Sequence, residues 1–223
     1  MIDETTCAVL CEPFQGEGGV RPLGKEYLAA LRDICDRREL LLIFDEVQTG
    51  IGRTGTLFAY QQLGITPDIL TSAKALGNGL PIGAMMTTEK IGMAFTPGTH
   101  ASTFGGNPVA SAAAVATLKV ILADGFLEDV QAKGKYLQAG LRSLQERFPA
   151  MITGVRGMGL IVGAVLSEEL IPVGTEIVNR MFERGFIMNF AGNVALRFVP
   201  PLIVSREEID HILKALGEVF AEF

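Results

Sequence analysis

Chemically reactive side chains follow two short apolar runs of the sequence. Asp45 and Glu46 come directly after Leu40–Phe44, and Lys74 follows Asp68–Ser72 after a single alanine. In an open parallel sheet, ligands bind beyond the carboxyl ends of the strands. Lysine is also the side chain that forms Schiff bases with carbonyl groups. We therefore treat these residues as a candidate site, with a solvated acidic loop and a surface lysine as the ordinary alternatives.

An aspartate and a lysine on neighbouring strand ends suit pyridoxal phosphate, which takes a lysine Schiff base and an acidic partner for its pyridine nitrogen. A buried run that ends in Asp-Glu is also typical of the metal-binding strand of an ATPase. That class requires the pattern GxxxxGK[ST], but the Gly-Lys pairs at Gly24 and Gly134 continue with Glu26 and Tyr136. The ATPase interpretation therefore lacks its phosphate loop.

Two further positions indicate anion binding. Thr103 precedes a helix that Asn107 and the proline after it are expected to begin, and a helix N-terminus beside a hydroxyl can hold a phosphate. A plain capping turn explains Thr103 equally well. Arg197 lies in an apolar strand, and because buried arginines are paired, we expect an internal carboxylate or a bound anion to face it.

The pattern along the chain predicts an α/β segment followed by an α+β segment. Ala8–Cys11 and Leu40–Phe44 are expected to be buried parallel strands with a helix between them. An Ala-rich helix from Pro108 to about Ala123 marks the boundary, and Ser205 with Glu208 predicts a capping box on the last helix. The remaining predicted elements are strands at Asp68–Ser72, Ile82–Thr87, Leu160–Val165, Phe186–Met188 and Ala195–Val199, one helix carrying Leu137, Leu141, Leu144 and Phe148, and one carrying Ile177, Val178, Met181 and Phe182.

Composition excludes several classes of protein. With 48% hydrophobic and 20% charged residues, the chain is expected to be globular rather than disordered. A net charge of -6 without a basic cluster argues against nucleic-acid binding. We expect no membrane span, no signal peptide and no metal site. Cys11 and Cys35 lie in apolar patterns, which favours buried free thiols and a cytoplasmic protein.

Five segments, in the same order along the chain, resemble the class III aminotransferases among the fold-type I pyridoxal-phosphate enzymes. The resemblance implies the C-terminal half of a large, mainly parallel-sheet domain in residues 1–110 and a smaller α+β domain in residues 111–223. Within the class, the sequence looks most like the acetylornithine group. The segments are EPFQGEGGVRP (Glu12–Pro22), LLLIFDEVQTGIGRTG (Leu40–Gly55), PDILTSAKALGNGLPIGA (Pro67–Ala84), THASTFGGNP (Thr99–Pro108) and LRFVPPL (Leu196–Leu202).

The resemblance also implies roles for individual residues. Lys74 would hold the cofactor and act as a base, and Asp45 would keep the pyridine nitrogen protonated. Arg197 would bind the α-carboxylate of glutamate and 2-oxoglutarate, while Glu17 would pair with Arg197 when an ω-amino donor is bound. The other implied cofactor contacts are Glu46, Val47, Gln48 and, from a neighbouring subunit, Thr103, with Ser102 near the substrate.

The implied activity is transfer of the ω-amino group of N-acetylornithine to 2-oxoglutarate, within arginine biosynthesis and in a homodimer. Ornithine and 4-aminobutyrate aminotransferases share most of the same motifs, and a catalytically inactive domain with a purely structural role is a further alternative. Members of the class are nearly twice this length. The N-terminal part that has no counterpart here carries the main phosphate-binding turn, the aromatic residue on the pyridine ring and a second substrate arginine. We therefore expect this chain alone to have no appreciable activity.

Overall fold

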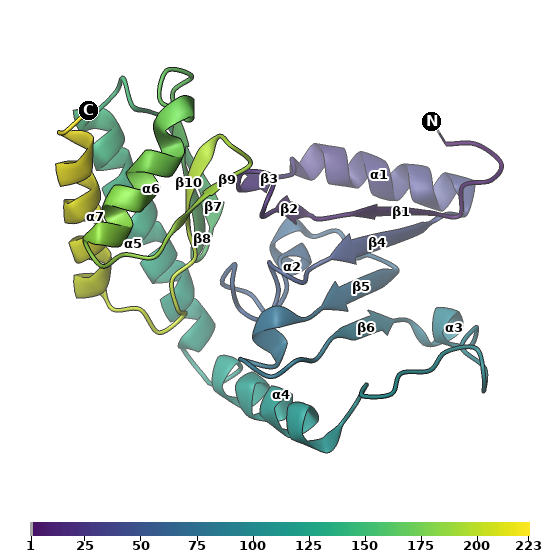
Figure 1. Cartoon of the computed structure of the whole chain (residues 1–223). Helices are drawn as coiled ribbons and strands as arrows, with labels where there is room; N and C mark the ends of the chain where they lie inside the picture. Colours follow the sequence, from purple (N-terminus) through teal and green to yellow (C-terminus); the bar gives the residue numbers. More distant parts are fainter. Residues whose placement is uncertain (1) are drawn as a thin grey trace. The chain divides into compact units, whose positions relative to one another are not determined.

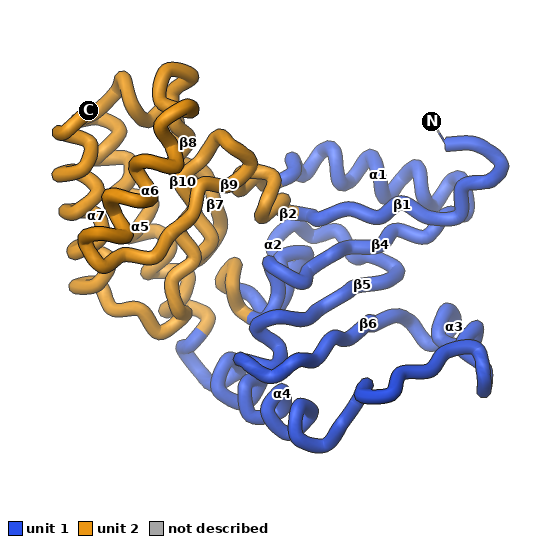
Figure 2. The backbone as a smooth tube through the Cα atoms, in the orientation of Figure 1, with its two compact units in different colours: residues 1–13, 23–51, 56–126 blue, residues 14–22, 52–55, 127–223 orange. Residues whose placement is uncertain are grey.

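The computed structural model describes residues 2–223, which form two compact units (Figure 2). Of the described residues, unit 1 contains 2–13, 23–51 and 56–126, and unit 2 contains 14–22, 52–55 and 127–223. The Ala-rich helix belongs to unit 1, so the units divide near its end. The division into domains at residue 110 stays a prediction.

Unit 1 is built on a four-stranded sheet with the order β1-β4-β5-β6 (Figure 1). The first three strands are parallel, as predicted from the strand–helix–strand pattern, whereas β6 runs antiparallel to β5. The carboxyl ends of β4 and β5 therefore meet at the same edge of the sheet. The strands are β1 (Ala8–Cys11), β4 (Leu41–Asp45), β5 (Ile69–Ser72) and β6 (Ala84–Thr87).

Helix α1 (Lys25–Arg38) packs against β4 and buries Leu28 and Cys35 completely. It ends where Glu39 adopts a left-handed conformation with φ of 55°, which breaks the helical hydrogen-bond pattern. Helix α4 (Pro108–Ile121) begins as predicted, because the side chain of its N-cap residue accepts a hydrogen bond from Ala110 N at 3.0 Å. The shorter helical segments are α2 (Tyr60–Leu63), the 3₁₀ turn η1 (Lys74–Leu76) and α3 (Glu89–Gly92).

Unit 2 has an antiparallel sheet with the order β7-β8-β10-β9, and a two-stranded hairpin of β2 and β3. Figure 1 shows α5, α6 and α7 grouped on one side of the four-stranded sheet. The strands are β2 (Phe14–Gln15), β3 (Arg21–Pro22), β7 (Ile152–Met158), β8 (Ile161–Leu166), β9 (Asn189–Ala191) and β10 (Ala195–Phe198).

The helices of unit 2 bury apolar faces whose spacing was visible in the sequence. They are α5 (Phe126–Arg147), the 3₁₀ turn η2 (Ile171–Val173), α6 (Gly174–Glu183) and α7 (Arg206–Phe220). Ser205 and Glu208 form the predicted capping box at the start of α7, with hydrogen bonds of 3.2 and 2.7 Å. Phe148 lies beyond the end of α5, and its ring still contacts that of Phe220.

Two predicted elements differ from the structure, and one strand was not predicted. The strand expected at Phe186–Met188 is wrong, because β9 begins at Asn189, whose pairing with Arg197 on β10 sets the register. Ile187 is 89% exposed, so its apolar character does not reflect a buried strand. The apolar face predicted for α6 is too wide, since Phe182 is 65% exposed. Strand β7 was missed because Gly154 and Gly157 interrupt its apolar pattern.

Cys7, Cys11 and Cys35 are all free thiols. Cys35 is buried as predicted, Cys11 is half-buried, and Cys7 is exposed. Among the described helices, none by itself is long and apolar enough to cross a membrane. The pair Pro108–Ile121 and Phe126–Arg147, bent by 72°, meets the criterion of length and composition together.

Candidate active site

Asp45 ends β4 beside Thr71 of β5 and is fixed there by two hydrogen bonds. The Thr71 hydroxyl donates to Asp45 Oδ1 at 3.3 Å, and the backbone N–H of Val47 donates to the same oxygen at 2.9 Å. Both bonds recorded for Asp45 within residues 2–223 end on Oδ1. The carboxylate is therefore held in one orientation, with Oδ2 available to a cationic N–H donor.

Lys74 follows β5 by two residues and opens the 3₁₀ turn η1. Its backbone φ is 44°, in the left-handed region that residues other than glycine seldom adopt, and such conformations are common at functional sites. Gly77 makes the turn after it possible, because a Cβ there would lie 1.9 Å from Leu80 O. Lys74 is exposed, so burial does not distinguish it from a surface lysine, and its backbone conformation is the feature that does.

Glu46 is completely buried, which excludes the alternative of an acidic residue in a solvated loop. Its Oε2 accepts hydrogen bonds from the Thr49 hydroxyl at 2.9 Å and Ala59 N at 2.6 Å, and Oε1 accepts from Tyr60 N at 2.8 Å. Burial raises the pKa of Glu46 above its usual value of 4.5, against the opposing effect of these donors. Both carboxylate oxygens of Glu46 therefore accept hydrogen bonds from residues that follow β4. A contact between Glu46 and a cofactor would involve the backbone of Glu46.

The other predicted cofactor contacts lie at the start of that loop and before α4. Val47 and Gln48 are half-buried. Ser102 and Thr103 are exposed, and the Ser102 hydroxyl accepts a hydrogen bond from Gly105 N at 2.9 Å. Ser102 thus stabilises the turn into α4, while Thr103 lies on the accessible side of that turn. Among residues 2–223, no group of three or more His, Cys, Asp and Glu side chains could hold a metal ion.

In unit 2, Arg197 is paired as expected for a buried arginine. Its side chain is 9% exposed, and Nη1 lies 2.7 Å from Glu17 Oε1 in an ion pair. Nε donates to Asn189 Oδ1 at 3.0 Å. The Glu17 side chain is 69% exposed, so one partner of the pair is fixed in the protein and the other reaches into solvent. Sequence reasoning missed Asn189, because only the register of β9 places it beside Arg197.

A second arginine of unit 2, also missed in the sequence, supports the end of β10. Arg53 Nη1 donates to Leu160 O at 3.1 Å and to Pro200 O at 2.6 Å, three residues beyond Arg197. Burial lowers the pKa of Arg53 to about 10. The GRTG motif gave no signal for this role, since the carbonyls that receive the bonds are distant in the sequence.

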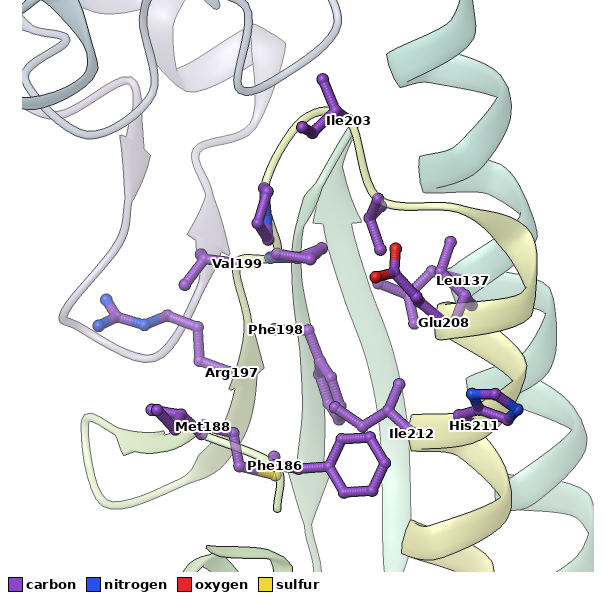
Figure 3. A pocket seen from close by; sticks show the side chains of 15 residues that line it. Leu137, Phe186, Met188, Arg197, Phe198, Val199, Ile203, Glu208, His211 and Ile212 are labelled. Atoms are coloured by element: carbon purple, nitrogen blue, oxygen red, sulfur yellow. The ribbon is translucent and has the colours of Figure 1, made fainter. Parts of the chain in front are cut away.

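An apolar groove of about 630 Å³ lies between β10 and α7 (Figure 3). Phe198 points toward Ile212 of α7, whereas the Arg197 side chain extends away on the opposite side of the strand. Strand alternation accounts for this difference, because successive side chains point to opposite faces of a sheet. The guanidinium therefore extends toward the sheet face opposite α7, although Arg197 is one of the residues that line the groove.

The Aminotransferase class-III family model matches residues 1–220. The chain belongs to the class-III aminotransferases. It is 49% identical over 99% of its length to the acetylornithine aminotransferase of Caldanaerobacter subterraneus, of which it covers 55%. It is 47% identical over 94% of its length to the succinylornithine transaminase of Citrobacter koseri, covering 51% of that protein. This class-III aminotransferase chain thus spans about half the length of the curated relatives it matches.

Solved structures agree with this assignment. N-acetylornithine aminotransferase from Stenotrophomonas maltophilia has a TM-score of 0.88 and 40% identity, with 97% of this chain and 57% of that chain covered. Ornithine aminotransferase from Toxoplasma gondii, crystallised with oxidised glutathione, shows partial occupancy of pyridoxal phosphate at its active site. It has a TM-score of 0.89 and 33% identity, covering 96% of this chain and 51% of that chain. The predicted fold-type I architecture is confirmed by these class-III neighbours.

Proposed function

We propose that this chain supplies the lysine-bearing half of a pyridoxal-phosphate-dependent aminotransferase. The reaction would transfer the ω-amino group of N-acetylornithine to 2-oxoglutarate. The observation that carries this function is the ion pair between buried Arg197 and exposed Glu17. It provides a carboxylate receptor that a flexible acid can cover or uncover, which an enzyme with two unlike substrates needs.

The residues at the carboxyl edge of the unit 1 sheet fit the cofactor. Asp45 is oriented by Thr71 and Val47 and keeps one carboxylate oxygen for the pyridine nitrogen. A charge-assisted hydrogen bond of this kind is worth about 1.5–3 kcal/mol. Pyridoxal phosphate, when bound, supplies an electron sink for the carbon that carries the amino group. Lys74 would attach the cofactor and move the proton at that carbon, with its strained backbone fixing the direction of its side chain.

The relatives favour an acylated ornithine as the amino donor. The curated acetylornithine and succinylornithine enzymes are 47% to 52% identical to this chain. Among solved structures, two acetylornithine aminotransferases are 40% and 33% identical, and the ornithine aminotransferases are 32% or 33% identical. Ornithine and 4-aminobutyrate remain the alternative donors to be compared in the assay. The reaction on N-acetylornithine would belong to arginine biosynthesis in the cytoplasm.

The remaining contacts belong to the same proposal. Gln48 would contact the ring hydroxyl, Val47 would pack on the ring, and Ser102 would lie near the substrate. Thr103, on the accessible side of the turn before α4, would reach the cofactor phosphate of a second subunit in a homodimer. Residues 1–110 would contribute to the cofactor domain and residues 111–223 would form the smaller domain.

The test is transamination of N-acetylornithine with 2-oxoglutarate by the 223-residue chain, alone and mixed with a polypeptide equivalent to the first half of a relative. We expect no appreciable turnover by the chain alone, because the resemblance assigns the main phosphate-binding turn to the other half. Misplacement of reacting groups by about 1 Å costs on the order of a hundredfold in rate. The mixture should gain cofactor absorbance and turnover together. A mixture that binds the cofactor without turnover would instead support the inactive structural domain.

A further inference from the structure

The register of the unit 2 sheet places two arginines in one row. Gly163 of β8 pairs with Arg156 of β7 on one side and with Arg197 of β10 on the other. Asn189 of β9 completes the row beside Arg197. Residues paired across neighbouring strands direct their side chains to the same face. Arg156 and Arg197 therefore share a face, two strand spacings or about 9.6 Å apart, with only a glycine between them.

The Gly16–Val20 loop lies over this row and contacts it at three points. Arg156 donates from both Nε and Nη2 to Gly19 O, at 3.0 and 2.5 Å, and Glu17 pairs with Arg197. Between them, Val20 packs on Gly163, where a Cβ would lie only 2.9 Å from Val20 Cβ. The glycine in the middle of the row thus makes room for the loop.

The ion pair is a weak anchor for this loop. The Glu17 carboxylate is mostly exposed, and pairs with an exposed partner contribute little net stability because solvent screens them. Val20 also has a φ of 58°, which is unfavourable for a β-branched residue, so its neighbours must hold that conformation. Two sets of contacts can hold this conformation. Val20 packs with Phe14 and Ile161, and Arg156 donates two hydrogen bonds to Gly19 O.

The surroundings of Arg156 disfavour its positive charge. Burial, and next the charge of Arg21, lower its pKa. No ion pair is recorded for Arg156 within residues 2–223, so its hydrogen bonds go to a neutral carbonyl. A guanidinium fork on one carbonyl fixes the direction of that peptide without competing with Arg197 for Glu17.

We propose that Arg156 is a positioning residue that fixes Gly19 and thereby holds Glu17 over Arg197. This inference rests on the proposed function, in which Glu17 masks the carboxylate receptor. Glu17 has glycines on both sides, at 16 and 18, so it can turn away while Gly19 stays attached to the sheet. Arg156 would thus set the balance between the covered and uncovered states of Arg197 without contacting a substrate.

The experiment compares the 223-residue chain with Arg156→Gln, Glu17→Gln and the double variant, and uses Arg142→Gln, on the exposed side of α5, as the control. Hydrogen exchange is measured on the peptide covering residues 14–22, and glutarate binding is measured by calorimetry. We expect Arg156→Gln to accelerate exchange in this peptide and to tighten glutarate binding, each on the order of tenfold. In the Glu17→Gln background, Arg156→Gln should change glutarate affinity by less than about twofold, because no mask is left to position.

Two further variants keep the outcome decisive. Gly19→Ala displaces the carbonyl without changing an arginine, since its Cβ would lie 2.6 Å from Val194 Cγ2, and it should reproduce Arg156→Gln. Arg156→Lys keeps the charge but loses the fork, so unchanged exchange and affinity in that variant would overturn the proposal. Equal effects of Arg156→Gln with and without Glu17 would overturn it as well. If no variant binds glutarate, the receptor role of Arg197 is rejected. In that case hydrogen exchange alone tests Arg156, and unchanged exchange of residues 14–22 in Arg156→Gln would reject its positioning role.

Discussion

Replacement of Glu46 by leucine tests whether this acid holds the loop that follows β4. Leucine is close to the glutamate in size but accepts no hydrogen bonds. It would leave Ala59 N, Tyr60 N and the Thr49 hydroxyl without the carboxylate that now receives them. Each unsatisfied buried donor costs about 1–3 kcal/mol. The hydroxyl can rotate to another acceptor, so we count only the two backbone donors.

Two orphaned backbone donors destabilise by about 2–6 kcal/mol. Removal of the buried charge offsets part of this loss, because desolvation already disfavours the ionised form of Glu46. We therefore expect a net loss of about 2–4 kcal/mol in the free energy that protects the amides of residues 56–64. Native-state hydrogen exchange on this segment measures that quantity, with Glu146→Leu on the exposed side of α5 as the control. A loss below about 1 kcal/mol would refute the assignment of Glu46 as the anchor of the loop.

Other predictions concern pH, the lysine, substrate choice and packing. Because burial raises the folded-state pKa of Glu46 above 4.5, its titration contributes stability that is fully present below that value and is lost as pH rises through the folded pKa. The destabilisation by Glu46→Leu should therefore shrink between pH 4 and pH 7, and a growing difference in exchange protection would contradict the sign. In a cofactor-binding assembly, borohydride reduction and peptide mapping should label Lys74, and a label chiefly on another lysine would reject its role. Arg197→Ala should impair the glutamate half-reaction by about 2–5 kcal/mol more than the ω-amine half-reaction, whereas Glu17→Ala should favour α-carboxylate substrates; equal losses in both half-reactions would exclude the switch. Gly163→Ala should destabilise unit 2 by about 1–3 kcal/mol through its contact with Val20, as measured by urea unfolding, and an unchanged midpoint would contradict that contact.

Features encoded by neighbouring residues were predictable from the sequence. The cap of α4 by Asn107 and the box between Ser205 and Glu208 depend on side chains within three residues of the backbone groups they contact. Periodicity likewise placed β4 and α1, because the buried positions repeat at the strand and helix periods. The prediction that an internal carboxylate or a bound anion would face Arg197 followed from the cost of burying an unpaired cation, and Glu17 is the carboxylate that does so.

Features set by strand register were not predictable in this way. The start of β9 depends on the pairing of Asn189 with β10, and the apolar residues before it misled the periodicity. The sequence predicted that Glu46 would contact the cofactor together with Asp45. Backbone donors at Ala59 and Tyr60, more than ten residues away, instead hold its carboxylate in the loop after β4. The roles of Arg53 and Arg156 depend on carbonyls at least 100 residues distant, and a carbonyl carries no sequence signal.

The two arginine contacts with carbonyls show why the candidate receptor needs more than its charged pair. Arg197 and Glu17 are 180 residues apart, and because solvent screens the exposed Glu17 carboxylate, the ion pair alone contributes about 0–1 kcal/mol. That energy is too small to order a glycine-rich loop, because fixing the backbone of one residue costs about 1–2 kcal/mol. Contacts with the neutral backbone must therefore hold the loop, which leaves the charged pair free to respond to a competing carboxylate. For Glu17 to leave Arg197 when a carboxylate competes, the Gly16–Val20 loop must therefore be held by contacts other than the Glu17–Arg197 pair.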